Sequence, residues 1–440
     1  MPSDRGTSAR GSTAAVRRVG RFRVVVVLLA VGATALAACG SSPARAASKA
    51  SSVAASAPGV TRTSVTVGQI ADISEPVPGL FKSAQVGVQA YFDYINSQGG
   101  VNGRKLILDS HDSLFQPADV VTAAQEIAKN ELAFVGNYTL LDSSAKAIID
   151  ADHVPNIGTP IGEALANDPN TYNPSPSGDY VADLGPFQYF KKKDPAATKH
   201  VGILYAAATP STIEAYQVLR QVFAHLGYKV IYARGFSAFE TTFTADVVKM
   251  KAAGVQFFWA DVPSNYSAVL AREMALQDFK PINYQTAGYG TNLTQLGGSA
   301  VNGTYLPLFT ALFLGQDAKT TPIVATFDKW MAKVDSKDSI ASWGAAGWAS
   351  ADLFVQALRN AGKNPTRASL VAALDKITSF NAHGLIPTSD PAKNVPSACW
   401  LLAQVKGNSI VRVPPSPRSG FICKPGGQLH LPGYAALKRG

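Results

Sequence analysis

The chain lacks the residue patterns on which most catalytic and metal sites depend. Its 440 residues include only three cysteines, and its six histidines (111, 153, 200, 225, 383 and 430) are scattered without ligand spacing. Gly-x-Ser-x-Gly, His-Glu-x-x-His and phosphate-loop patterns are missing. Ser143-Ser144-Ala145-Lys146 has a Ser-x-x-Lys spacing, but its partner motifs are absent. The sequence therefore predicts no enzyme, no metal site and no cofactor.

Charge is also sparse, at 16% of the residues. The net charge of +10 at first suggests an anionic partner, but residues 1–38 hold six Arg and one Asp, which is half of that excess. The longest basic cluster, Lys191-Lys192-Lys193, is typical of a solvated helix end. We therefore expect no nucleic-acid partner. The hydrophobic content of 46% indicates a globular chain long enough for two or three domains.

No apolar run is long enough to be a persuasive membrane span. Val24 to Ala35 is about a dozen residues long, follows six arginines and precedes Leu36-Ala37-Ala38-Cys39. This order resembles a bacterial lipoprotein signal, in which the cysteine is lipidated. The resemblance predicts a signal peptide over 1–38, a lipid attached to Cys39 and an anchor on the outer face of the cytoplasmic membrane. An ordinary signal peptide cut near Ala38 is the alternative.

The segment after Cys39 is rich in Ala and Ser up to Pro58 and has no hydrophobic period. It predicts a flexible tether over about 39–60. In an oxidising compartment, the two remaining cysteines, Cys399 and Cys423, are expected to form a disulfide.

From Thr63 onward, strand and helix patterns alternate in two successive runs, before and after His200. Helical spacing of apolar residues marks Lys82–Ser97, and Gly99-Gly100 ends this helix. Strands are expected at 65–67, 106–108, 132–135, 154–157, 201–205, 229–232 and 255–259. Helices are expected from 117 onward and at 143–151, 243–253, 267–277, 321–333 and 344–361, and a hairpin is expected at 398–413. Two β-α-β-α runs predict an α/β fold with parallel sheets.

The segment from Asn96 to Leu106, read as N-S-Q-G-G-V-N-G-R-K-L, resembles the type I periplasmic binding proteins of branched-chain amino acid and amide ABC transporters. Phe243 to Val255 and Trp343 to Leu358 resemble later segments of that family. The resemblance implies two Rossmann-like lobes joined by three crossover strands. Lobe one would hold 61–185 and 308–380, and lobe two 186–307 and 381–440. It also implies a small-molecule ligand between the lobes, which could be an amino acid, an amide or an apolar or aromatic carboxylate, and an ABC permease as partner.

Ligands of open α/β sheets bind beyond the carboxyl ends of the strands, which gives the candidate residues by position. They are Phe81, Tyr138, Thr139, Ser143, Thr159, Tyr205, Asp261 and Tyr289. Backbone N–H groups near Ser143 could hold an anion, although Ser143 could equally be a plain helix cap. Tyr138 and Tyr205 could clamp an apolar ligand or belong to the core. Asp261 could pair with a ligand cation, remain solvated or cap the next helix.

Two loops depart from the family pattern for amino-acid binders. Leu140-Leu141 and Gly158-Thr159-Pro160-Ile161-Gly162 stand where hydroxyl-bearing residues are usual. Because an unpaired buried charge is costly, we expect a ligand less polar than an amino acid, such as an amide or an apolar or aromatic carboxylate. A sensory binding module is the alternative function, and a cell-surface enzyme or structural lipoprotein is a third.

Overall fold

The computed structural model describes residues 57–75, 79–166, 168–176, 181–335, 340–414, 416–423 and 427–431. The predicted signal peptide, the lipid-bearing Cys39 and most of the predicted tether lie outside these residues. In the described part, no helix has both the length and the apolar character needed to cross a membrane.

One half of the molecule, called the first half, is built on a parallel sheet, called sheet one, whose described strands run in the order β2-β1-β3-β4-β5. Their bounds are β1 (Ser64–Ala71), β2 (Lys105–Asp112), β3 (Phe134–Val135), β4 (Asn156–Ile157) and β5 (Thr171–Tyr172). The associated helices are α1 (Lys82–Ser97), α2 (Pro117–Asn130), α3 (Lys146–Asp152), α4 (Glu163–Ala166), α11 (Pro322–Val334), α12 (Ser342–Asn360) and α13 (Arg367–Leu374).

The second half is built on sheet two, in the order β13-β12-β11-β10-β9-β7-β8. Its strands are β7 (Val201–Ala206), β8 (Val230–Phe236), β9 (Phe257–Ala260), β10 (Ile282–Gln285), β11 (Tyr305–Leu308), β12 (Cys399–Lys406) and β13 (Ser409–Arg412). Helices α5 (Gly185–Lys193), α6 (Pro210–Leu226), α7 (Thr244–Ala252), α8 (Ser264–Leu276) and α9 (Thr291–Gly297) belong to this half, whereas α10 (Asp317–Thr320) packs on α11. The strands from β8 to β11 are parallel, whereas β12 runs antiparallel to β11 and β13.

The chain passes from sheet one to sheet two after β5, leaves sheet two after Leu308 and returns to it at Cys399. A short antiparallel pair, β6 (Val181–Asp183) with β15 (Gln428–His430), accompanies the first passage. Cys399 on β12 and Cys423 on β14 (Ile422–Cys423) form a disulfide. The predicted fold class and the predicted disulfide are therefore confirmed.

The segment that carried the family resemblance builds the turn between α1 and β2. The Asn96 side chain accepts a hydrogen bond from the Leu106 N–H at 2.8 Å and donates one to the Leu106 carbonyl at 2.9 Å. Gly100 has a φ of +75°, and a Cβ there would lie 2.0 Å from the Arg104 carbonyl oxygen. The motif therefore has a structural role, because its Asn and Gly residues fix the tight turn that joins α1 to β2.

One predicted helix differs from the structure at its start. The helix expected over 143–151 begins as a 3-10 turn, Asp142–Ala145, and continues as α3. Such turns are frequent at helix N-termini. Here the Asp142 side chain accepts backbone N–H groups from the loop at Ile161 and Gly162.

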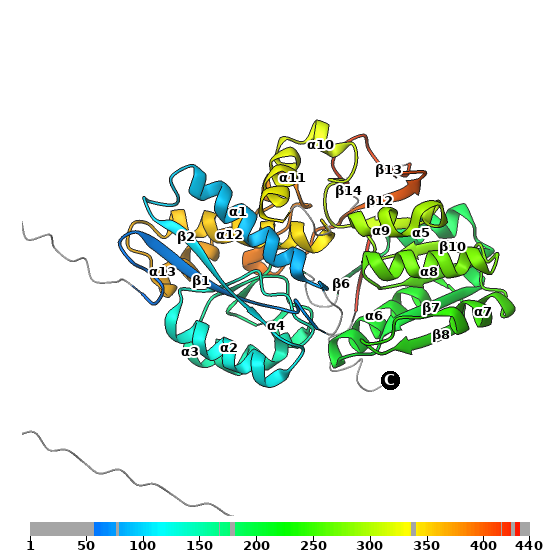
Figure 1. Ribbon diagram of the computed structural model, residues 1–440, viewed down its shortest axis with the longest axis horizontal. Coiled ribbons are helices and arrows are strands. Elements are labelled where there is room, and N and C mark those ends of the chain that lie inside the picture. Colours follow the sequence, from blue (N-terminus) through cyan, green and yellow to red (C-terminus); the bar gives the residue numbers. More distant parts are fainter. Residues whose placement is uncertain are drawn as a thin grey trace, which may run out of the picture. The chain divides into compact units, whose positions relative to one another are not determined.

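Close contact between α1 and α12 holds the first half together (Figure 1). A Cβ at Gly87 would lie 2.1 Å from the Gly344 carbonyl oxygen, and a Cβ at Gly347 would lie 2.1 Å from the Ala84 carbonyl oxygen. Beside this seam, the buried Tyr91 hydroxyl donates a hydrogen bond to Asp352 at 2.6 Å. The two backbones therefore approach as closely as glycine permits.

We predict that Gly347→Ala destabilises the protein. Overpacking typically costs about 1–3 kcal/mol, which exceeds the roughly 1 kcal/mol that Ala gains in helix propensity. Urea unfolding followed by circular dichroism measures the change. Asn360→Ala, at an exposed site on the same helix, is the control and should change stability by less than about 0.5 kcal/mol. Equal stability of the two variants would contradict the close packing.

Candidate functional site

Three adjoining cavities form a cleft at the carboxyl ends of the strands of both sheets, and Trp343 lines all of them. The first, which we call the apolar cavity, has a volume of about 190 Å³. It shares Tyr138 with the second cavity and Asp261 with the third. The second cavity is more polar and includes Thr159, Asp183 and Gln428.

The apolar cavity receives side chains from both halves of the chain. Sheet one and α12 contribute Leu80, Phe81, Tyr138, Leu140, Ile161 and Trp343, and sheet two with its helices contributes Ala206, Ala208, Ser211, Thr212, Ala215, Phe236, Ala238, Asp261, Pro263, Tyr266 and Ala287. The residues of β7, β8 and β9 lie at or directly after the last residue of each strand. Parallel strands bring these ends to one edge of the sheet.

An aromatic cluster forms the wall on the side of sheet one. The ring centroids of Phe81 and Tyr138 are 4.9 Å apart, and Trp343 lies 5.5 Å from Phe81 and 5.2 Å from Tyr138. Phe81 and Tyr138 are buried. Such tilted and edge-to-face pairs fix the rings in place, so this wall is largely formed before a ligand arrives.

Asp261 is the charged residue in the lining of the apolar cavity. It follows β9, and its Oδ1 accepts a hydrogen bond from the Thr286 hydroxyl at 2.6 Å. Its side chain is exposed to the cleft, but protein surrounds the cleft, and this desolvation raises the pKa of Asp261 above its usual range despite the bond from Thr286. The carboxylate is thus placed to accept from a ligand.

The loops at the ends of β1 and β3 are joined by buried Asp72. Its Oδ1 accepts from the hydroxyls of Ser113 and Thr139, and its Oδ2 accepts from the Leu140 N–H at 2.8 Å. Burial raises the pKa of Asp72, and these hydrogen bonds oppose that rise. The candidate Thr139 is therefore buried and holds the loop for its neighbour Leu140, which lines the cavity.

Buried Asp142 plays the same part at the end of β4. Its Oδ2 accepts from the N–H groups of Ile161 at 2.7 Å and Gly162 at 2.9 Å, and the Ser143 N–H also hydrogen-bonds to it. The N–H groups near Ser143 that we expected to hold a ligand anion therefore have partners within the protein, because that of Ser143 donates to Asp142 and those of Asp142 and Ser144 donate to the carbonyls of Thr139 and Leu141. Ser143 itself is exposed and does not line the apolar cavity.

The remaining candidates are placed as follows. Thr159 lies with Tyr138 in the second cavity, and its buried Oγ1 has no hydrogen-bond partner among the described residues. Tyr205 does not face Tyr138 across the cleft, because its ring stacks on Tyr216 at 3.7 Å. Tyr289 is fully buried, and its hydroxyl accepts from the Leu314 N–H at 2.8 Å. Neither of these two tyrosines lines the described cavities.

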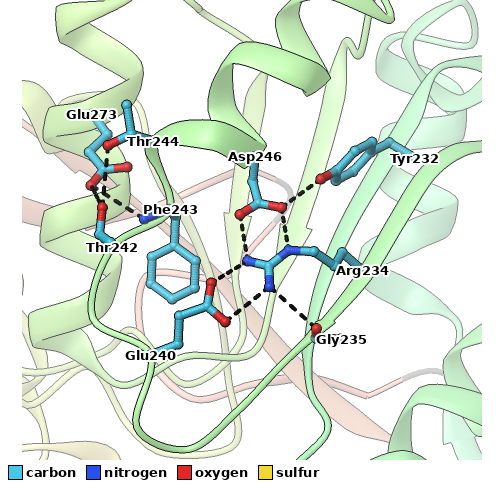
Figure 2. Close-up of polar contacts among 9 residues, drawn as sticks. All are labelled: Tyr232, Arg234, Gly235, Glu240, Thr242, Phe243, Thr244, Asp246 and Glu273. Carbon is cyan, nitrogen blue, oxygen red and sulfur yellow. Dashed lines mark hydrogen bonds and ion pairs between the residues drawn. The ribbon is translucent and has the colours of Figure 1, made fainter.

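An ion-pair network fixes the loop between β8 and α7, which supplies Ala238 to the cavity. Figure 2 shows the Arg234 guanidinium between the carboxylates of Glu240 and Asp246. It donates to both oxygens of Glu240, at 3.0 and 2.6 Å, and the Tyr232 hydroxyl donates to Asp246. Two-pronged contacts of this kind hold the loop in one geometry.

A sequence model of the family described as "Periplasmic binding protein" matches residues 64–409, well over half of the chain. The chain belongs to the periplasmic binding protein family. This membership implies an extracytoplasmic location and a solute-binding role. It also confirms the family predicted from the Asn96–Leu106 segment.

Curated relatives match this periplasmic binding protein over a short segment. The Leu/Ile/Val-binding protein BraC3 of Rhizobium johnstonii is 32% identical over 71 residues, which cover 16% of this chain and 19% of that protein. The Leu/Ile/Val-binding protein homolog 3 of Brucella melitensis matches to the same extent. The match thus spans about a fifth of the length of either relative.

Solved structures match along nearly their whole length. A fatty acid ABC transporter substrate-binding protein from Thermomonospora curvata has a TM-score of 0.72 at 19% identity, covering 84% of this chain and 95% of that chain. A branched-chain amino acid ABC transporter protein from Thermus thermophilus with bound valine has a TM-score of 0.68 at 16% identity, covering 82% and 97%. At these identities the likeness shows the fold.

Sequence reasoning missed several residues of the cavity of this periplasmic binding protein. Trp343 stands next to the helix expected from Gly344, and Phe236 and Tyr266 lie at the end of β8 and in the first turn of α8. For Phe236 and Tyr266 the available signal was positional, since one ends a strand and the other opens a helix at the carboxyl edge of sheet two. For Trp343 even that signal is absent, because α12 reaches the cleft only through its packing on α1.

We predict that Asp72→Ala destabilises the fold by about 1–3 kcal/mol, because it leaves the Leu140 N–H and two buried hydroxyls without their acceptor. Asp72→Asn should cost less, since an amide oxygen can still accept from Leu140. Chemical denaturation measures both. The exposed Gln125→Ala on α2 serves as control, and an Asp72→Ala midpoint no lower than that of this control would refute the role of Asp72.

Proposed function

We propose that this protein captures a small, mainly apolar organic ligand between its two lobes and delivers it to an ABC permease. In this proposal a lipid on Cys39 holds it at the outer face of the cytoplasmic membrane. The supporting observation is the apolar cavity, whose lining comes from both sheets and holds a single charged residue, Asp261. Binding that draws the lobes together around a ligand is a hinge motion.

The polar groups of the cleft favour a ligand with a hydrogen-bond donor over one with a free carboxylate. The lining of the apolar cavity has no Lys, Arg or His. The N–H groups of Leu140, Ile161 and Gly162 already donate to Asp72 and Asp142. An anionic ligand group placed against these loops of sheet one would therefore find neither a cation nor one of these three N–H groups to stabilise it.

The relatives give two reference chemistries. The Thermus protein holds valine, and the Thermomonospora protein is titled as a fatty acid binder. A zwitterion could place its ammonium group at Asp261 but would leave its carboxylate unpaired. We propose an apolar amine or amide as the ligand class, with the apolar body against Phe81, Tyr138 and Trp343 and the N–H toward Asp261.

Isothermal titration with matched compounds tests this class. The series is phenylethylamine, phenylacetamide, phenylacetate and phenylalanine, together with octanamide, octanoate and leucine. We expect amines or amides to bind at least about tenfold, or 1.4 kcal/mol, more tightly than the acids and amino acids. Tight binding of leucine or octanoate, with no response to the amine and amide, would overturn the proposed ligand class.

Asp261→Asn provides the matching variant. It should weaken amine binding by about tenfold or more, because a charge-assisted hydrogen bond contributes roughly 1.5–3 kcal/mol, while amide binding should change less. An amine needs the ionised carboxylate, so its affinity should fall as the pH decreases through the raised pKa of Asp261, at a higher pH than for an ordinary aspartate. The variant should lose this pH dependence. Titrations between pH 4 and 8 decide the point, and an unchanged profile would remove Asp261 from the site.

Cys39→Ala tests the proposed anchor. Without the thiol no lipid can be attached, so we expect the variant in the soluble fraction of lysed cells and the wild type in the membrane fraction. Immunoblotting of both fractions measures this, with Cys423→Ala as a cysteine control that should remain with the membrane. Recovery of the wild type in the soluble fraction would rule out a lipid anchor on this residue.

A further inference from the structure

A second cluster of polar side chains lies away from the cleft, on sheet one. Asp109 and His111 are separated by one residue on β2 and therefore share one face of that strand. Glu131 follows the last residue of α2. One ligand atom of each residue lies within 4.8 Å of the others, and the Asp109 Oδ2 is 3.6 Å from the His111 Nε2.

Gly68 on β1 makes the approach of Glu131 possible. Gly68 pairs in register with Asp109 on β2. A Cβ at Gly68 would lie 2.5 Å from the Glu131 Oε2, so any side chain there would displace the carboxyl group. The absence of a side chain thus opens space over β1 through which Glu131 reaches the residues of β2.

The Glu131 carboxyl group is buried, and one of its oxygens has no hydrogen bond within the described part of the chain to offset the loss of water. Glu131 is 3% exposed, and its Oε2 has no hydrogen-bond partner among the described residues. The His111 Nε2, which lies 3.6 Å from the Asp109 Oδ2, is also buried and has no hydrogen-bond partner among the described residues. Buried polar atoms of this kind normally have hydrogen-bond partners. A proton or a cation bound between them would supply the partner that these atoms lack.

A further carboxylate lies near the imidazole. The Glu126 carboxylate from α2 is 3.9 Å from the His111 Nδ1, which is beyond hydrogen-bond distance, and Asp109 lies at the other ring nitrogen. Asp109, whose side chain is 56% exposed, gives an ion access from solvent.

We propose that Asp109, His111 and Glu131 bind one divalent transition-metal ion, with water completing its coordination. One imidazole and two carboxylates suit Zn²⁺ and its neighbours, whereas Mg²⁺ and Ca²⁺ prefer oxygen ligands alone. The ion would tie β2 to the end of α2. This site is independent of the ligand proposed for the cleft.

Histidine spacing could not reveal this cluster, because it contains only one histidine. The other two ligands are carboxylates, one of them 20 residues further along the chain. They meet only because β1 and β2 pair side by side and α2 returns the chain to the same sheet.

Untagged protein stripped with EDTA and titrated with Zn²⁺, Mn²⁺, Mg²⁺ and Ca²⁺ tests the proposal. We expect one equivalent of Zn²⁺ to bind and to raise the melting temperature, with little response to Mg²⁺ or Ca²⁺. Asp109→Asn and His111→Gln should each weaken Zn²⁺ binding on the order of tenfold or more. His225→Gln and Asp278→Asn, at exposed sites elsewhere, are the controls and should bind as the wild type does.

Glu131→Gln separates a metal site from a carboxyl pair that merely shares a proton. The neutral amide keeps the shape of the side chain, so the metal-free variant should melt at or above the wild-type temperature, and Zn²⁺ should no longer stabilise it. Wild-type binding of Zn²⁺ by His111→Gln or Glu131→Gln would overturn the proposal. So would the absence of Zn²⁺ binding to the wild type, which would leave the shared proton as the explanation.

Discussion

Two buried carboxylates, Asp72 and Asp142, hold in place the loops that form the sheet-one side of the cleft. Each accepts backbone N–H groups from the loops after the strands of sheet one. Such N–H groups at strand ends and helix starts are the usual means by which α/β folds hold anions. Because the protein supplies its own anions here, the loops are rigid and their donors are occupied. The side chains that these loops present to the cavity are apolar, and the charged residue of the lining, Asp261, lies on the second half.

This arrangement links the stability of the first half to its function. The same hydrogen bonds that fix Leu140 and Ile161 also turn these apolar side chains into the cavity. The aromatic wall depends on a further contact, the close packing of α12 on α1, which brings Trp343 beside Phe81 and Tyr138. On the second half, the ion pairs of Arg234 hold the loop after β8. The cleft is therefore formed largely by contacts made before binding.

The fold followed from the sequence more closely than the site did. The helix predicted at Lys82–Ser97 has those bounds in the structure, because its apolar spacing and Gly99-Gly100 are local signals. Of the candidate site residues, Phe81, Tyr138 and Asp261 line the apolar cavity and Thr159 lines the neighbouring one. Tyr205 and Tyr289 do not, since a position near a strand end does not say whether a ring turns toward the cleft or packs on Tyr216 or Phe313.

The sequence alone determined the α/β class, the family and the Cys399–Cys423 pair, because hydrophobic period, turn residues and cysteine count are properties of the chain itself. Tertiary structure alone decided which polar groups already have partners within the protein and which could still bind a ligand or an ion. Asp72 meets Leu140 across 68 residues, and Glu131 meets Asp109 over a glycine on the strand between them. Hydrogen bonds and burial depend on distance in space, and no local pattern in the chain records which donor a distant carboxylate will take.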